Sequence, residues 1–283
     1  MTIATTARLP SGTPAAAAAI IELRAVTKIF RARGQDLTVF DGLSCRIAPG
    51  GFVSVIGPSG CGKSTLLKII SGLEPATAGA ALFEGRAVAG PPKGMIYVFQ
   101  QYTKSIFPWL TVRRNVEFGL TARKAVSRAE ARQRCDEYIN LVGLHGYADY
   151  YPYQLSGGMQ QRVCIARALI GEPAVLLMDE PFSAVDAMTR ALLQDLVLKI
   201  WDTLAITILF VTHDVDEAVL LSSRIISLGR AGAGIAQDVA IDLPRPRDQI
   251  TTRAEPRFTA LRQQLFASIF AQEKIEATTG ETP

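Results

Sequence analysis

Short hydrophobic runs and segments with helical spacing alternate along most of the chain. Residues 174–178 form a continuous apolar run of strand length, which is typical of a strand buried on both faces of a parallel sheet. Further strands are predicted at residues 21–26 with 28–30, 43–47, 52–56, 80–83, 95–99, 206–211 and 225–228. Helices are predicted at residues 64–71, 112–120, 129–142, 156–170, 188–204 and 215–221. This alternation predicts an α/β fold.

Two parts of the chain depart from a plain succession of strands and helices. Residues 112–120 and 129–142 are both helical in spacing and separate two of the predicted strands, so we expect a helical insertion. Near the end of the chain, residues 258–270 carry large aliphatic side chains four residues apart, such as Leu261 and Leu265. This amphipathic pattern predicts a helix that docks on its own chain or on a partner.

The composition is that of an ordinary soluble globular protein, because 48% of the 283 residues are hydrophobic and 20% are charged. The longest apolar runs, such as residues 15–21, are shorter than the about 20 residues that a spanning helix needs, so the chain is not expected to cross a membrane. Residues 1–14 contain one basic side chain, which argues against a secretory signal. We expect residues 1–20 to be a disordered tail.

Cysteine, histidine and charge argue against several kinds of site. Cys45, Cys61, Cys135 and Cys164 form no C-x-x-C pair, and the chain has two histidines, so no zinc site is expected and the thiols are interpreted as reduced. The net charge of +4 is spread along the sequence, which gives little support for a nucleic-acid partner.

A glycine-rich stretch, residues 57–65, matches the phosphate-binding loop pattern G-x-x-x-x-G-K-[ST] between a predicted strand and a predicted helix. The glycines let backbone N–H groups face phosphates at the positive end of the helix, Lys63 adds a point charge, and Ser64 is expected to hold Mg²⁺. This context argues against an ordinary glycine turn. The expected nucleotide-binding residues of the loop are Gly57, Pro58, Ser59, Gly60, Cys61, Gly62, Lys63, Ser64 and Thr65. Cys61 is either a reactive thiol or, as we favour, a filler at a variable position.

Polar side chains follow two of the predicted strands. Asp179 and Glu180 come directly after the buried run, and ligands of doubly wound sheets bind beyond such carboxyl ends. Asp179 is expected to order Mg²⁺ through its water shell, and Glu180 to orient and polarise an attacking water. His213, beside Asp214 at the end of another strand, is expected to donate to the terminal phosphate. The alternatives are a helix-capping turn at 179–180 and a purely structural histidine.

Residues 155–162, LSGGMQQR, resemble the signature motif of ATP-binding cassette proteins. Other motifs of that family match as well: Gln100 resembles the Q-loop glutamine, residues 183–186 the D-loop, His213 the switch histidine, and Phe30 the ring that stacks on adenine. Val185 stands where leucine is more common, and Phe30 where tyrosine is common. The resemblance extends over residues 21 to about 245.

The resemblance implies the fold and its divisions. It implies an α/β P-loop NTPase core with a mostly parallel sheet, formed by residues 21–100 and 166–250, and an N-terminal antiparallel β subdomain. A helical subdomain with the signature is expected at residues 101–165, and a C-terminal helical tail at residues 251–283.

A second anion site is predicted at the signature, where the Ser156 hydroxyl and the N–H groups of Gly157 and Gly158 lie at a helix N-terminus. The resemblance implies that ATP is held between the phosphate loop of one copy and the signature of a second, so the partner is a homodimer mate. It also implies nucleotide contacts from Gln160 and Asp186, a metal contact from Gln100, and catalysis by Lys63, Gln100, Glu180 and His213.

Two short stretches are similar to those of importer ATPases for nitrate, sulfonates and taurine: residues 107–112 (FPWLTV) and 243–247 (LPRPR). This similarity implies a peripheral subunit at the cytoplasmic face of the inner membrane that drives a permease served by an extracytoplasmic solute-binding protein. Phe107 and Trp109 would receive the permease, or they only pack the helical insertion on the core. A soluble cassette ATPase of DNA repair or translation is the alternative, but one phosphate loop and no heptad run argue against it, and a metabolic kinase would not need the signature.

Overall fold

The structure, a computed structural model, describes residues 19–32, 34–120 and 127–279. Its larger sheet has six strands in the order β10-β9-β3-β8-β7-β6. Five of them are parallel: β3 (Phe52–Ile56), β6 (Met95–Val98), β7 (Val175–Asp179), β8 (Thr207–Val211) and β9 (Arg224–Leu228). The edge strand β10 (Ile235–Ala240) is antiparallel to β9. Every residue of β3, β7 and β8 is buried, which explains why these strands consist mostly of apolar residues.

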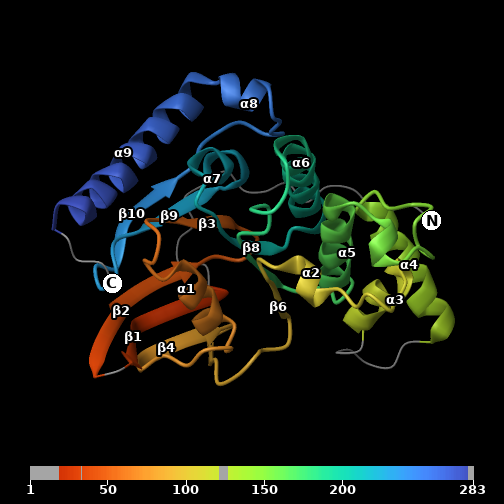
Figure 1. The fold of residues 1–283 in the computed structure, drawn as a ribbon, viewed down its shortest axis with the longest axis horizontal. Helices are drawn as coiled ribbons and strands as arrows, with labels where there is room; N and C mark the ends of the chain where they lie inside the picture. The colour runs from red at the N-terminus through yellow and green to blue at the C-terminus, as the bar shows by residue number, and fades with distance from the viewer. Residues whose placement is uncertain (1–18, 33, 121–126, 280–283) are drawn as a thin grey trace.

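A second, antiparallel sheet lies beside the first and has the order β2-β1-β4-β5 (Figure 1). Its strands are β1 (Ile21–Ala32), β2 (Gln35–Ile47), β4 (Ala78–Phe83) and β5 (Arg86–Ala87). Strand β2 begins eight residues before the predicted strand at 43–47, because residues 35–37 are exposed and the adjacent buried pair Val39 and Phe40 does not follow a period of two. Side chains of both sheets and of helix α1 (Lys63–Ile70), such as Leu23, Phe40, Val53 and Leu67, share one hydrophobic core.

The helical insertion lies between β6 and β7 in the chain and on the right of Figure 1. It contains α2 (Tyr102–Ser105), α3 (Val112–Glu117), α4 (Arg128–Leu141) and α5 (Gly157–Leu169). The helix predicted at 112–120 ends as an α-helix at Glu117 and continues as a 3₁₀ turn. Gly119 in that turn touches α5 so closely that a Cβ would lie 2.2 Å from the Arg167 carbonyl oxygen.

The C-terminal segment packs on its own chain. It comprises α8 (Thr251–Ala254) and α9 (Pro256–Thr279), and in Figure 1 α9 runs alongside α7 (Val215–Leu221). Phe258, Leu261 and Leu265 are buried in a third core with side chains of α7. Of the two arrangements expected for residues 258–270, docking on the same chain is therefore confirmed. The remaining long helix, α6 (Ala187–Leu204), leads from β7 toward β8.

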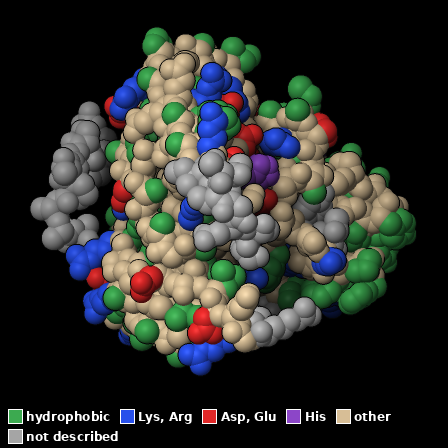
Figure 2. All heavy atoms as spheres, turned by 60° about the vertical axis from the view of Figure 1, so that its left-hand side comes forward, with side chains coloured by type: hydrophobic (Ala, Val, Ile, Leu, Met, Phe, Trp, Pro, Cys, Tyr) green, Lys and Arg blue, Asp and Glu red, His purple; other side chains and the backbone are tan. Residues whose placement is uncertain are grey.

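Three properties of the described residues bear on the sequence expectations. No helix among them is long and apolar enough to cross a bilayer. On the face drawn in Figure 2, both basic and acidic side chains are scattered among the other residues, as they are along the sequence. The tail predicted at residues 1–20 lies almost wholly outside the described residues.

Candidate nucleotide site

The glycine-rich loop joins β3 to α1, as the sequence predicts, with the helix beginning one residue early at Lys63. Gly62 has φ 98°, and a Cβ there would lie 2.3 Å from Cγ1 of Val39. Gly57 has φ 150°, and a Cβ there would lie 2.8 Å from the Leu228 carbonyl oxygen. Both positions therefore exclude side chains, because the backbone conformation and the neighbouring strands leave no room.

The Lys63 ammonium lies within the loop. It is buried and donates to the carbonyl oxygens of Gly57 at 2.9 Å and Pro58 at 2.8 Å. The loop tip at Ser59 and Gly60 is exposed, and Thr65 is half-buried in the first turn of α1. The loop thus presents a cation and an open helix N-terminus on one side, a suitable arrangement for phosphate.

The surroundings of Cys61 argue against a reactive thiol. Its side chain is 2% exposed, and burial raises the pKa of the thiol despite the opposing effect of Lys63. A buried thiol with a raised pKa carries little thiolate at neutral pH, so the filler interpretation is favoured.

Two elements meet at the position expected for a metal ion. The Ser64 hydroxyl on α1 donates to Oδ1 of Asp179 over 2.9 Å, and Asp179 ends β7. Tyr97 on β6, which the sequence did not single out, donates its hydroxyl to Oδ2 of the same carboxylate over 2.8 Å. Burial and the Asp179 carboxylate raise the pKa of Tyr97, so the phenol stays protonated and remains a donor.

These donors fit Mg²⁺. A hydroxyl and one carboxylate supply hard oxygen ligands, and Mg²⁺ in nucleotide sites is usually held by one or two such groups together with phosphate oxygens and water. Asp179 is 6% exposed, and its partners hold it at the edge where the loop opens. Among the described residues there is no cluster of three or more His, Cys, Asp or Glu side chains that would hold a metal without such help.

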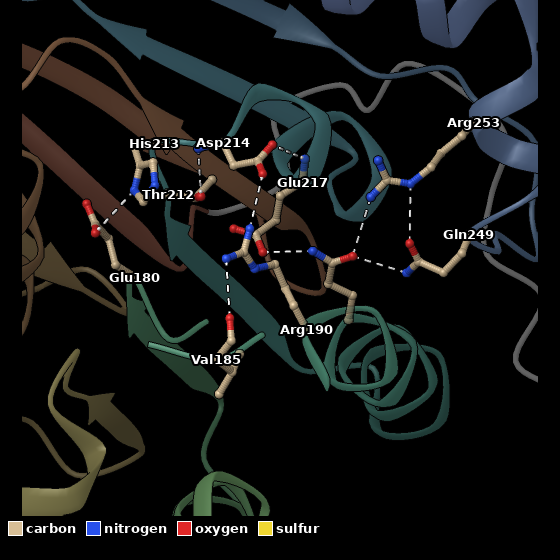
Figure 3. A network of polar contacts seen from close by, with 10 residues as sticks. Glu180, Val185, Arg190, Thr212, His213, Asp214, Glu217, Gln249 and Arg253 are labelled. Carbon is tan, nitrogen blue, oxygen red and sulfur yellow. Dashed lines mark hydrogen bonds and ion pairs between the residues drawn. The ribbon is translucent and has the colours of Figure 1, made fainter. Parts of the chain in front are cut away.

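Three predicted residues from different strand ends come together around one carboxylate. The Gln100 amide donates to Oε2 of Glu180 over 3.1 Å, and Nδ1 of His213 lies 3.3 Å from the same oxygen. Figure 3 shows Glu180 and His213 facing each other. Glu180 has φ 43°, a strained conformation for a residue with a side chain, and its N–H donates to the Val211 carbonyl oxygen over 2.9 Å. The expected grouping at the carboxyl edge of the sheet is therefore present.

The segment that presents His213 is fixed by its neighbours. The Asp214 N–H donates to the Thr212 hydroxyl over 3.0 Å, and the Asp214 carboxylate caps α7 by accepting from the Glu217 N–H over 3.0 Å. Arg190 on α6 lies 3.7 Å from the other carboxylate oxygen of Asp214. The His213 ring itself remains largely exposed.

The predicted second anion site lies at the start of α5. Ser156 caps this helix by accepting from the Met159 N–H over 3.3 Å, and Ser156 and Gly157 are exposed. Gly158 is buried against α6, since a Cβ there would lie 2.3 Å from Cγ2 of Thr189. In Figure 1, α5 lies with the insertion and α1 lies toward the antiparallel sheet, so the two anion-binding helix ends are apart within one chain.

Two residues expected to touch nucleotide are bonded within their own chain. The Gln160 amide donates to the carbonyl oxygens of Pro152 and Leu155 at 2.9 and 3.3 Å. The Asp186 carboxylate caps α6, and hydrogen bonds from Thr189 lower its pKa. Both side chains thus shape the elements that carry the signature and the D-loop. Gln161, the next residue, links the helix of the signature to the segment before the D-loop, because its amide donates to the carbonyl oxygen of Pro181.

Phe30, the expected adenine platform, lies near the end of β1 with 37% of its surface exposed. Lys28 lies two residues earlier on the same strand, and its ammonium is 4.6 Å from the centre of the Phe30 ring, held there by Glu74 and the Pro75 carbonyl oxygen. A half-exposed ring with a fixed cation beside it can stack on a flat base.

An exposed aromatic surface lies on the insertion. Phe107 packs against Phe118 and Trp109 with ring centres 4.8 and 5.5 Å apart, and Arg167 lies over its ring. Packing accounts for Phe107, but Trp109 is 70% exposed and Phe118 49% exposed. We call Phe107, Trp109 and Phe118 the insertion patch.

Comparison with known proteins identifies the family. The family model described as ABC transporter matches residues 40–183. An uncharacterised ABC transporter ATP-binding protein of Methanocaldococcus jannaschii is 48% identical over 81% of this chain and 85% of its own length. The aliphatic sulfonates import ATP-binding protein of Bacillus subtilis is 43% identical over 89% of this chain and 95% of its own.

A solved structure agrees in fold. A dimeric ATP-binding cassette in a post-hydrolysis state, bound to ADP and Pi, is 33% identical with a TM-score of 0.68, and the match covers 78% of this chain and 98% of that one. The phosphate loop, the signature and the carboxylate at the strand edge therefore occur in a chain whose fold and sequence are those of the family. The protein belongs to the ABC transporter family of ATP-binding proteins and is an ABC ATPase.

Proposed function

We propose that this chain is the ATP-hydrolysing subunit of an importer for a small anion, and that it works as a homodimer on a membrane permease. The observation that carries the hydrolytic part is the convergence of Gln100 and His213 on one oxygen of Glu180. The importer part is supported by relatives named for import or transport of aliphatic sulfonates, nitrate and bicarbonate, which are 43 to 44% identical.

ATP binding is assigned to the loop between β3 and α1. Backbone N–H groups of residues 59–65 surround the phosphates, and the Lys63 ammonium exchanges the carbonyl oxygens of Gly57 and Pro58 for phosphate oxygens. Phe30 stacks on the adenine. Mg²⁺, when bound, would neutralise charge on the phosphates, and Ser64 and Asp179 would hold it, with Gln100 proposed as a further ligand.

Hydrolysis is assigned to the groups at the strand ends. Glu180 orients the attacking water and polarises it toward the terminal phosphate, and its carboxylate is held by Gln100. His213 donates to the phosphate as charge develops there. Gln100 and His213 already contact Glu180 in the structure. We therefore expect nucleotide binding to redistribute these hydrogen bonds within a site that is already assembled.

The separation of the two helix ends supports the proposed dimer. Ser156 and Gly157 are exposed at the start of α5 and have no phosphate loop of their own beside them, so we propose that they close on the nucleotide of a second copy. ATP binding then favours the closed dimer and hydrolysis releases it. Gln160 and Asp186 act indirectly in this proposal, by shaping the signature and the D-loop.

The insertion patch is proposed as the contact with the permease. Trp109 and Phe118 are large apolar side chains left exposed, and such clusters are typical of protein interfaces. In this arrangement the subunit lies at the cytoplasmic face of the membrane and meets a solute-binding protein only through the permease.

Hydrolysis and dimerisation are tested together. Glu180→Gln is expected to bind ATP, to lose at least about 100-fold in kcat because the carboxylate is gone, and to elute as a dimer with ATP in size-exclusion chromatography. Glu172→Gln, which changes a glutamate outside the site, is the control. A Glu180→Gln variant that stays monomeric and turns over at the wild-type rate contradicts the proposal.

The permease contact is tested in membranes. A tagged chain should copurify with a polytopic membrane protein from detergent extracts, and the pair reconstituted in liposomes should couple ATP hydrolysis to anion uptake. Trp109→Ala is expected to weaken this association, whereas Tyr153→Ala, which removes another exposed ring, should not. Stable association with nucleic acid or ribosomes in place of a membrane protein overturns the importer assignment.

A further inference from the structure

A continuous set of polar contacts joins the C-terminal segment to the strand end that carries His213 (Figure 3). Gln194 on α6 is at its centre and is 2% exposed. Its amide donates to Oε1 of Glu217 over 2.9 Å, and its carbonyl oxygen accepts from the Gln249 amide over 3.1 Å. Gln249 precedes α8, so three elements distant in sequence meet at one buried amide.

Arg253 completes the contact from α8. Its guanidinium donates to the side-chain oxygens of Gln249 at 3.2 Å and Gln194 at 3.5 Å. The Gln249 amide also reaches the carboxylate of Asp195 at 2.9 Å and the carbonyl oxygen of Ala191 at 3.3 Å. Gln194 is therefore held from the C-terminal side by two residues, which fixes the direction in which its amide donates to Glu217.

Glu217 connects the Gln194 side chain to residues 212–214, the segment that carries His213. The residue is 4% exposed, and burial raises the pKa of its carboxyl group, while hydrogen bonds from Thr212 and Gln194 act in the opposite direction. Its N–H is capped by Asp214. Glu217 thus forms hydrogen bonds with Thr212 and Asp214, the residues on both sides of His213. Because its buried carboxyl group has few hydrogen-bond donors, the loss of one donor is expected to change its position.

The C-terminal helix α9 also faces the segment that carries His213, across a cavity. It has a volume of about 520 Å³ and is lined by His213, Asp214 and Asp216 on one side and by Arg262 and Phe266 of α9 on the other. Arg262 lies 3.7 Å from a carboxylate oxygen of Asp216. The environment of the His213 ring is thus bounded by the C-terminal segment as well as by Glu180.

We infer that the C-terminal segment sets the position of the switch histidine, with Gln249 and Arg253 acting through Gln194 and Glu217. These four are positioning residues: among the described residues, none of them forms a hydrogen bond or an ion pair with Glu180 or with the phosphate loop. The inference rests on the proposed role of His213 in hydrolysis. It assigns to the C-terminal segment an effect on turnover that is separate from packing alone.

The test uses the full chain and the variants Gln249→Leu and Arg253→Met. The matched control is Gln133→Leu on α4, where another glutamine amide donates to a glutamate carboxylate over 2.9 Å, far from the site. Loss of one aligned hydrogen bond in the chain of contacts is expected to lower kcat by about 5-fold, with the KM for ATP unchanged. ATP-driven dimerisation in a Glu180→Gln background should be retained.

A second readout reports the position of the ring directly. The chain has two histidines, so its imidazole NMR spectrum holds two sets of signals, and a His145→Gln variant assigns them. In Gln249→Leu and Arg253→Met the His213 signals are expected to shift or broaden while those of His145 stay in place, and Gln133→Leu should change neither.

The outcomes separate this inference from the proposed function. Unchanged His213 signals and unchanged kcat in both variants overturn the inference, as does a fall in thermal stability with neither change. A wild-type chain without ATPase activity overturns the proposed function, yet the His213 signals still decide whether the C-terminal segment positions the ring.

Discussion

At the scale of residues, the site depends on carboxylates that are held by more partners than their motifs suggest. Asp179 uses both oxygens, one for Ser64 and one for Tyr97. Asp179, Glu180 and His213 could be predicted because the ends of parallel strands meet at one edge. Tyr97 could not, because it lies inside a strand, and the direction of its hydroxyl depends on the register of β6 with β7.

Tyr97→Phe is expected to raise the Mg²⁺ concentration that gives half-maximal ATPase activity by about 5-fold, because Asp179 loses one aligned donor of about 1 kcal/mol. Binding of ATP without Mg²⁺ should be unchanged. A titration of the ATPase rate with Mg²⁺ measures the midpoint. Equilibrium binding of a fluorescent ATP analogue in EDTA measures the affinity without Mg²⁺. Tyr153→Phe, at an exposed ring, is the control. An unchanged Mg²⁺ midpoint contradicts the role of Tyr97.

At the scale of elements, periodicity predicts what is buried and misses what is half-exposed. The fully buried strands and the helices that cover them were predicted within a few residues. Strand β10 was missed because its residues alternate between partly buried and exposed and include Gln237 and Asp238. The short helix α8 lies within the helical tail expected at residues 251–283, but it was not predicted as a separate helix, because four residues carry no measurable period. Asp186, by contrast, carried a readable signal: an aspartate directly before a helix is a favoured N-cap.

Gly158→Ala is expected to destabilise the fold by about 1 to 3 kcal/mol, because a methyl group would lie within 2.3 Å of Cγ2 of Thr189 and force α5 away from α6. Urea denaturation followed by circular dichroism measures the free energy of unfolding. Gly157→Ala, at the neighbouring exposed position, should cost far less. Adding Thr189→Ser, which removes the clashing methyl group and keeps the hydroxyl, should recover most of the lost free energy of unfolding. Equal costs for the two glycines would argue against the contact.

At the scale of the whole molecule, the phosphate loop and the signature of one chain serve different nucleotides in the proposed dimer. A site then consists of Lys63 from one copy and Ser156 from the other. This arrangement could be inferred from the sequence only through the resemblance, since nothing in the hydrophobic pattern says that two helix N-termini of one chain face different ligands.

Mixing two inactive variants tests that arrangement. Lys63→Ala should fail to bind ATP, and Ser156→Arg should bind ATP without dimerising. A mixed dimer contains one site with both residues intact, so an equimolar mixture is expected to recover up to roughly a quarter of the wild-type rate, because half of randomly formed dimers are mixed. The ATPase rate against mixing ratio measures it. A mixture no more active than its components would mean that each chain completes its own site.

The two tryptophans of the chain lie in opposite environments. Trp109 in the insertion patch is 70% exposed, whereas Trp201 on α6 is 5% exposed, and its indole N–H donates to the Gly50 carbonyl oxygen over 3.0 Å. Fluorescence of the free protein should therefore have a red-shifted component that acrylamide quenches and a blue-shifted component that resists it. Binding of a permease fragment to the insertion patch should protect the first and leave the second unchanged. The intrinsic fluorescence of the protein thus offers an optical signal for that contact without any label.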